Sequence, residues 1–171
     1  MIFSILLAAL AQSSAAPPVE VTDFPAIFAA ACMDGEARLS ANDASRIGFD
    51  ALPAELKSSL GEPESANVWR LNGNGRGYLY VLNYPVGRGT SPKICGVASD
   101  VMNFEAGVRM LDKRLAGNML RNPSRTMQWL RPRDGYVATV TTAAKFGVLQ
   151  INWLSEADRH RLIAETSSLP K

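Results

Sequence analysis

The block between residues 67 and 99 restricts the fold most, because its pattern predicts three strands in succession. Residues 68–71 and 78–84 combine aliphatic and aromatic side chains, and the turn sequence Asn-Gly-Asn-Gly lies between them. Asn and Gly tolerate the positive φ angles of tight turns, so the pattern is typical of a β-hairpin. A third strand is predicted over 93–99. Large side chains alternate on both sides of 78–84, so both faces of the sheet should be at least partly covered.

Helices are predicted before this block. A first helix, capped by Thr22 or Asp23, carries an apolar stripe and should end at Gly35. A short second helix is predicted over 40–47. A third is predicted over 52–60, where leucines recur on one helical face. The first third of the chain is therefore expected to be helical.

A helix and further strands are predicted after the block. Apolar residues recur at helical spacing over 103–120, which indicates an amphipathic helix with charged residues on its other face. Strands are predicted over 126–131, 136–143 and 148–154. A last helix should begin at Ser155, where the sequence Ser-Glu-Ala-Asp resembles a capping box.

This order predicts an α+β domain. N-terminal helices should be followed by an antiparallel sheet of five or six strands, packed by the one long amphipathic helix. With 47% hydrophobic and 20% charged residues, the composition is that of an ordinary globular protein. No run of Pro, Gly or Ser is long enough to separate two domains, so we expect residues 16–171 to form a single α+β domain.

The N-terminus predicts export. Residues 2–11 are an apolar run that is shorter than the roughly 20 residues needed to span a bilayer, and small residues follow it. We expect cleavage between Ala15 and Ala16, which makes residues 1–15 a signal peptide and the product periplasmic or secreted, without a membrane span. No Lys or Arg precedes the run, so a buried N-terminal helix or strand is the alternative. No Cys follows the run, which excludes a lipoprotein anchor.

Export changes the interpretation of the cysteines. The chain has two, Cys32 and Cys95, and an oxidising compartment favours pairing between them. Two separate buried thiols are one alternative. Half of a metal site is the other, but only His160 and scattered carboxylates are available to complete it, and no metal-ligand spacing occurs. We expect a disulfide and no metal.

Residues suited to catalysis are few. His160 is the only histidine, so any mechanism that needs an imidazole base must use it, and no serine lies in a nucleophile-elbow sequence. The carboxylate pairs Glu62 with Glu64 and Glu105 with Asp112 have the character of solvated surface charges. The sequence therefore favours a protein that is not an enzyme. A small cell-envelope hydrolase that uses carboxylates or His160 is the alternative.

No cofactor is expected. Gly73, Gly75 and Gly77 have the spacing G-x-G-x-G before a strand, whereas the dinucleotide fingerprint is G-x-G-x-x-G between a strand and a helix. A hairpin turn is favoured over a ligand loop. No Walker sequence occurs.

Charge is distributed unevenly along the chain. Residues 1–100 carry an excess of three negative charges, and residues 101–171 carry an excess of five positive charges. A possible anion-binding patch comprises Arg109, Lys113, Arg114, Arg121 and Arg125. Its partner would be an anionic envelope lipid or polymer. A solvated face balanced by the acidic first half is the alternative, and export together with a pI near 8.7 argues against nucleic acid.

The aromatic side chains gather on the predicted strands. The set is Trp69, Tyr78, Tyr80, Tyr84, Trp129, Tyr136 and Trp153. Packing within the core and across the sheet explains most of it, and a groove for a sugar or a lipid is the alternative.

The layout resembles a known group of proteins. A short signal is followed by Cys32 at the end of a first helix, by the Leu52-Pro53 helix, and by Cys95-Gly96-Val97 before an amphipathic helix. In this it resembles small uncharacterised exported proteins of alphaproteobacteria. That resemblance implies export and a disulfide and carries no activity. We expect a small exported, non-enzymatic binding or accessory module of the cell envelope, with an unknown ligand or a protein partner.

Overall fold

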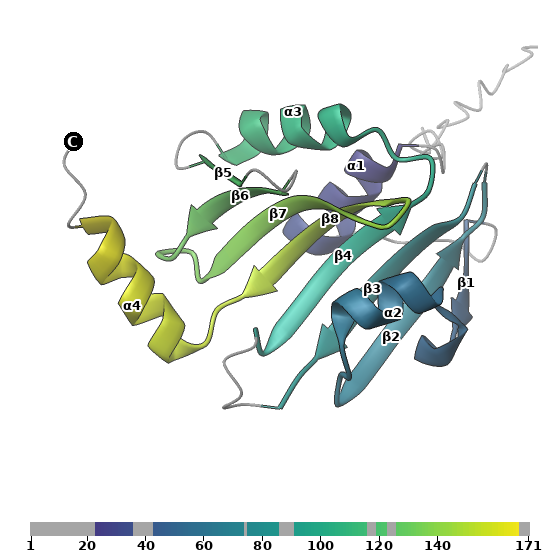
Figure 1. Cartoon of the computed structure of the whole chain (residues 1–171), viewed down its shortest axis with the longest axis horizontal. Coiled ribbons are helices and arrows are strands. Elements are labelled where there is room, and N and C mark those ends of the chain that lie inside the picture. Colours follow the sequence, from purple (N-terminus) through teal and green to yellow (C-terminus); the bar gives the residue numbers. More distant parts are fainter. Residues whose placement is uncertain are drawn as a thin grey trace, which may run out of the picture.

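An eight-stranded antiparallel sheet forms the centre of the molecule, in the order β1-β2-β3-β4-β8-β7-β6-β5 (Figure 1). The computed structural model describes residues 23–35, 43–73, 75–85, 91–115, 119–122 and 126–167. Its strands are β1 (Ala44–Ile47), β2 (Ser65–Leu71), β3 (Gly77–Asn83), β4 (Lys93–Ser99), β5 (Met119–Asn122), β6 (Thr126–Arg131), β7 (Tyr136–Ala143) and β8 (Phe146–Trp153). The α+β class is confirmed, and the expected five or six strands are too few.

The helical segments lie between and around these strands. They are α1 (Phe24–Phe28), the π-helix η1 (Ala29–Met33), the 3-10 turn η2 (Phe49–Ala51), α2 (Ala54–Leu60), α3 (Phe104–Leu115) and α4 (Glu156–Ser167). Several predicted signals act as expected. The Asp23 carboxylate accepts a hydrogen bond from the Ala26 N–H at 3.1 Å, and the Asp158 N–H donates to the Ser155 hydroxyl at 3.2 Å.

The two additional strands replace segments that were expected to be helical. The prediction of a helix over 40–47 is wrong, because Ala44–Ile47 pairs with β2 as an edge strand. The helix expected to reach residue 120 ends at Leu115, and Met119–Asn122 pairs with β6 at the opposite edge. Hydrogen bonds to a neighbouring strand decide both segments, and local propensity gives no sign of them.

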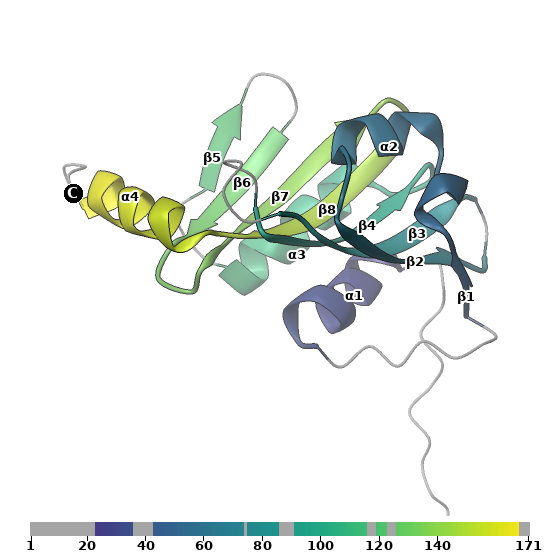
Figure 2. The ribbon, with the colours of Figure 1, turned by 90° about the horizontal axis from the view of Figure 1, so that it is seen from below.

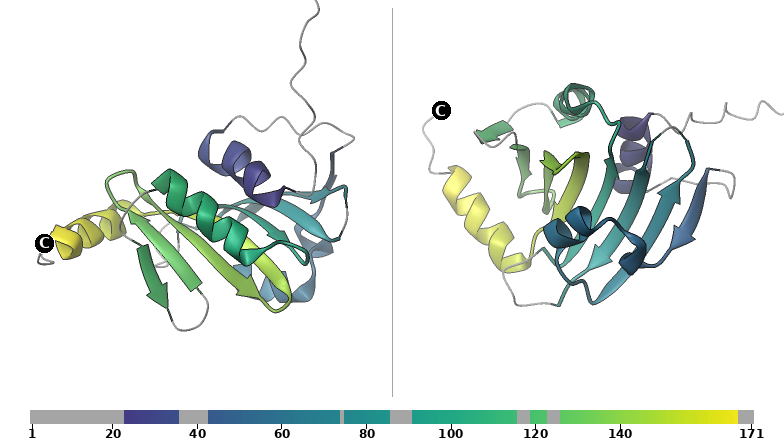
Figure 3. Two further views of the ribbon diagram at one scale, coloured as in Figure 1. Left: turned by 90° about the horizontal axis from the view of Figure 1, so that it is seen from above. Right: turned by 45° about the vertical axis from the view of Figure 1, so that its right-hand side comes forward.

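Helices cover both faces of the sheet. Figure 2 shows α1 and α3 on one side and α2 on the other, and in Figure 3 α1 and α3 lie next to each other. The core under α1 and α3 includes the fully buried Phe28, Leu111 and Trp129, and the core under α2 includes Leu56 and Phe146. The expectation that one long helix packs the sheet is therefore wrong, whereas the expectation of two covered faces is confirmed.

The topology repeats within the described residues. In each half a helical segment precedes four strands, with α1 and η1 before β1 to β4 and α3 before β5 to β8. The last strands of the two halves, β4 and β8, pair along seven residues at the middle of the sheet. The two halves therefore share one continuous sheet, and both contribute to the apolar cluster on each of its faces.

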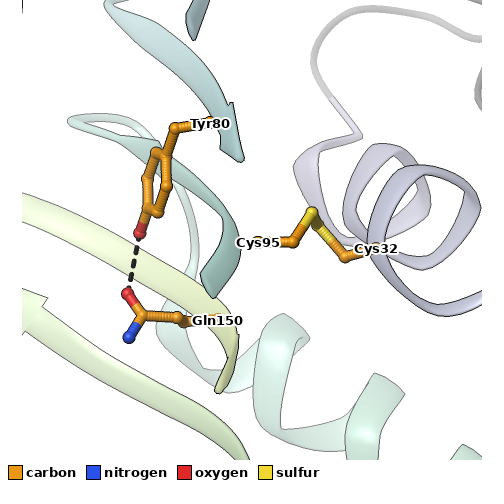
Figure 4. Close-up of a disulfide and its surroundings, with 4 residues drawn as sticks. All are labelled: Cys32, Tyr80, Cys95 and Gln150. Atoms are coloured by element: carbon orange, nitrogen blue, oxygen red, sulfur yellow. Dashed lines mark hydrogen bonds between the residues drawn. A yellow bond between two sulfur atoms is a disulfide. The ribbon is translucent and has the colours of Figure 1, made fainter. Parts of the chain in front are cut away.

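A disulfide ties the first helical segment to this central pair. Cys32 of η1 and Cys95 of β4 are bonded, their Cα atoms lie 5.6 Å apart, and both residues are buried (Figure 4). The predicted pairing is confirmed. Because 63 positions separate the two cysteines, the crosslink spans most of the first half.

On the sheet face opposite the disulfide, side-chain hydrogen bonds connect β3 with β8 across β4. Tyr80 of β3 is fully buried, and its hydroxyl donates to the Gln150 side chain of β8 at 3.0 Å (Figure 4). The Gln150 side-chain amide donates in turn to the side-chain oxygen Oδ1 of Asn152 at 2.6 Å. Burial raises the pKa of Tyr80 far above its usual value. The Tyr80 side chain can extend over β4 because residue 96 is a glycine, since a Cβ there would lie 2.5 Å from the Tyr80 hydroxyl.

The proposed signal peptide lies outside the described residues. In the part of the chain that is described, no helix combines the length and apolar character needed to cross a membrane.

Reduction of the disulfide should lower the free energy of unfolding by about 4 kcal/mol, because the crosslink restricts a long loop in the unfolded chain. Urea unfolding with and without reductant measures the difference. The double variant Cys32→Ala/Cys95→Ala is the control and should not respond to reductant. An unchanged midpoint in fully reduced wild-type protein would contradict the stabilising role.

The substitution Gly96→Ala should lower the free energy of unfolding by about 1–3 kcal/mol, because the new methyl group overpacks the Tyr80 crossing. Gly48→Ala is the matched control, since Gly48 has φ −74° and open space around its Cβ position. Urea unfolding of both variants checks this. Equal effects of the two substitutions would show that the crossing does not depend on glycine.

Candidate functional site

Four side chains form a row across the end of the sheet face that carries α1 and α3. The strand register pairs Lys93 of β4 with Trp153 of β8, Trp153 with Tyr136 of β7, and Tyr136 with Arg131 of β6. Side chains alternate along a strand, so this row shares its face with the buried residues two positions further along each strand. The sheet therefore presents two neighbouring aromatic rings with a cation at each end.

Contacts hold the two cations in place. The Lys93 ammonium lies 4.9 Å from the centre of the Trp153 ring, a cation–π distance. The Arg131 guanidinium donates a hydrogen bond to the carbonyl oxygen of Leu115, the last residue of α3. A positive charge is favourable there, because unpaired carbonyl groups give a helix C-terminus a partial negative charge.

A pocket of 490 Å³ opens above the aromatic pair. Its walls come from η1 and the residue after it, from the end of α3, from the turn before β7, and from β7 and β8. The lining residues are Cys32, Met33, Asp34, Arg114, Leu115, Asp134, Tyr136, Ile151 and Trp153. Trp153 and Tyr136 are partly exposed, and Leu115 and Ile151 are buried. This volume and mixture of groups are typical of sites for small ligands.

An ion pair bridges the two helical walls of the pocket. Asp34 directly follows η1, two positions after the disulfide-bonded Cys32, and its N–H donates to the Ala29 carbonyl at 2.9 Å. One guanidinium nitrogen of Arg114 donates to both Asp34 carboxylate oxygens, at 2.8 and 3.0 Å. Both side chains are about two-fifths exposed, so the bridge orients polar groups more than it stabilises the fold.

The second carboxylate of the pocket belongs to Asp134, which lies in a turn that is fixed by hydrogen bonds. Gly135 adopts a positive φ of 83°, and its carbonyl accepts from the Leu154 N–H at 2.9 Å. The Arg159 side chain of α4 donates to the carbonyls of Pro132 and Arg133, at 3.0 and 2.7 Å. The turn that carries Asp134 is thus fixed by hydrogen bonds from Leu154, which follows β8, and from the Arg159 side chain of α4.

The environment of Tyr136 changes its acidity. Burial raises the pKa of its hydroxyl, the Asp134 carboxylate raises it further, and Arg131 partly offsets the rise. Tyr136 therefore stays a neutral hydrogen-bonding group at neutral pH.

The predicted basic patch is described only in part. Arg109, Lys113 and Arg114 are exposed on α3, and Arg114 is bonded to Asp34. Arg121 belongs to β5, and Arg125 lies outside the described residues. The patch therefore stays a prediction.

The other candidates do not contribute to the pocket. His160 is exposed on α4 and is absent from the lining. The glycine-rich sequence joins the antiparallel strands β2 and β3, so the hairpin is confirmed. Among the residues that the structure describes, no three His, Cys, Asp or Glu side chains gather closely enough to hold a metal ion.

Part of this site could be predicted from the sequence. Tyr136 and Trp153 were assigned to a possible groove, Arg114 to the patch, and Cys32 to the disulfide. Asp34 and Asp134 were missed as site residues. Each directly precedes a glycine that signals a helix end or a turn, in Asp34-Gly35 and Asp134-Gly135. Nothing in the local sequence indicates that both aspartates face one cavity.

Comparisons with known proteins add no assignment. No family model matches the chain, and neither does any curated protein or solved structure.

The substitution Asp134→Asn should move the pKa of Tyr136 down, because it removes a negative charge that opposes phenolate formation. The pKa should stay above the ordinary tyrosine value, since burial is the larger cause. NMR titration of the Tyr136 ring measures this. Asp50→Asn, on the exposed η2, is the control and should leave it unchanged. An unshifted Tyr136 pKa in Asp134→Asn would contradict the electrostatic effect of Asp134 on Tyr136.

Proposed function

We propose that this protein is an exported, non-enzymatic binding module of the cell envelope, and that the pocket above Trp153 and Tyr136 is its ligand site. The apolar N-terminal run and the buried Cys32–Cys95 disulfide support export, because disulfides persist in oxidising compartments. The resemblance to exported alphaproteobacterial proteins agrees with this. The observation that carries the binding role is the 490 Å³ pocket with its aromatic floor.

Strand pairing, a disulfide and a buried hydrogen bond fix the floor and the walls of the pocket. Its floor consists of residues from two paired strands, and one wall contains the disulfide that fixes η1 to β4. The other wall is fixed because the fully buried Trp129 of β6 donates its indole N–H to Asp112 of α3 at 3.1 Å. A preformed site binds with less loss of conformational entropy than one that must be ordered.

A hydrolase is the second candidate, because Asp34 and Asp134 line the same pocket. Paired carboxylates are the groups that glycosidases use. Against this, the Arg114 guanidinium already engages both oxygens of Asp34, which leaves this carboxylate poorly placed to deliver or accept a proton. Turnover of a glycoside that stops in both Asp34→Asn and Asp134→Asn would favour the hydrolase over the binding module.

The exposed cations of α3 support a different partner. Arg109 and Lys113 point away from the core on the outer face of this helix. An anionic envelope lipid or polymer, or a protein partner, would use that face and leave the pocket empty.

NMR screening with a library of small neutral, cationic and anionic molecules tests the binding role. We expect binders to shift the indole N–H signal of Trp153, which lines the pocket, and to leave that of Trp69 on β2 unchanged. The chain has three tryptophans, so the signals are readily separated. If no compound shifts the Trp153 signal, or if only anionic vesicles bind and do so through α3, the proposed ligand site is wrong.

A further inference from the structure

We infer that the ligand of this pocket is a neutral saccharide, with the apolar face of one pyranose ring stacked on Trp153. This inference rests on the proposed binding function and specifies the chemistry of its ligand. It follows from the charges around the aromatic pair and from the groups that line the cavity.

The row beneath the pocket disfavours a cationic ligand. The Lys93 ammonium already interacts with the Trp153 ring at 4.9 Å, and Arg131 occupies the position beyond Tyr136. A ligand ammonium stacked on Trp153 would share the ring with the Lys93 ammonium. Of the two carboxylates in the lining, Asp34 is already paired with Arg114. Aromatic sites for cations gain their affinity from ring faces that no other cation uses.

The lining equally disfavours an anionic ligand. It contains two carboxylates, Asp34 and Asp134, and one cation, Arg114. The Arg114 guanidinium is committed to Asp34 through bonds of 2.8 and 3.0 Å. An anion in the pocket would approach both carboxylates, and Arg114, the cation among the described lining residues, would have to leave its ion pair to bind it.

The same groups suit a neutral polyhydroxylated ring. One face of a pyranose presents C–H groups that pack on an indole, while its hydroxyls both donate and accept hydrogen bonds. Asp134 provides acceptors, the Arg114–Asp34 pair provides donors and acceptors side by side, and the Tyr136 hydroxyl does both. The pocket volume of 490 Å³ is sufficient for a saccharide ring.

Titration calorimetry and NMR with a panel of methyl glycosides and disaccharides test the inference, with choline and inorganic phosphate as cationic and anionic comparisons. We expect at least one saccharide to bind and to shift the Trp153 indole signal. Asp134→Asn should weaken that binding at least tenfold, because a charged hydrogen-bond acceptor is lost. Asp50→Asn, remote from the pocket, is the matched control and should bind normally.

Two variants of Trp153 separate stacking from folding. Trp153→Phe keeps an aromatic face and should retain part of the affinity, whereas Trp153→Ala should lose it. Circular dichroism and the Trp129 indole signal report whether each variant is folded. Asp134→Asn keeps the test independent if Trp153→Ala does not fold, because Asp134 is exposed in a turn.

The outcomes distinguish this inference from the proposed function. If choline or phosphate shifts the Trp153 signal and no saccharide does, the pocket is a ligand site but the saccharide inference is overturned. If saccharides bind without affecting Trp153, or equally well to Asp134→Asn, the inference is overturned as well. If no compound of any class shifts Trp153, the binding function itself fails.

Discussion

The pairing of β4 with β8 is the interaction on which the rest of this structure depends. It joins the two halves of the chain, each a helical segment followed by four strands, into one sheet. The same register places Lys93 beside Trp153 and Gly96 beside Gln150. The hydrogen bonds between β4 and β8 thereby set the positions of two contacts. One is the cation–π contact between Lys93 and Trp153 at the candidate site, and the other is the hydrogen bond from Tyr80 to Gln150 across β4.

Different forces hold the two faces of this central pair. On one face, the disulfide anchors η1 to β4 beneath a core of aliphatic and aromatic side chains. On the other face, the hydroxyl of Tyr80 is satisfied by Gln150 inside an apolar cluster, which avoids the cost of burying an unpaired polar group. The pocket lies on the disulfide side, where η1 and α3 end and no longer cover the sheet. The candidate site therefore lies where the helices no longer cover the aromatic row of the sheet.

Long, periodic or well-capped segments could be predicted from the sequence. Asp23 and the Ser155–Asp158 pair cap their helices as their residue types suggest, and β4 occupies the expected residues 93–99. The two edge strands could not be predicted. Each has only four residues and one neighbouring strand, so its alternation is too short to outweigh a helical pattern. The two additional strands lengthen the sheet at its two edges.

The sequence by itself determined the α+β class, the disulfide pair and most capping sites, because these depend on local pattern and on residue chemistry. Tertiary structure alone decided that Asp34, Asp134, Arg114, Tyr136 and Trp153 line one pocket. Three of them lie on α3, β7 and β8, and the two aspartates lie just after η1 and just before β7. Their proximity depends on the pairing of β7 with β8 and on where η1 and α3 end. Register and helix length are set by packing of the whole domain, and a linear sequence pattern carries no direct record of either.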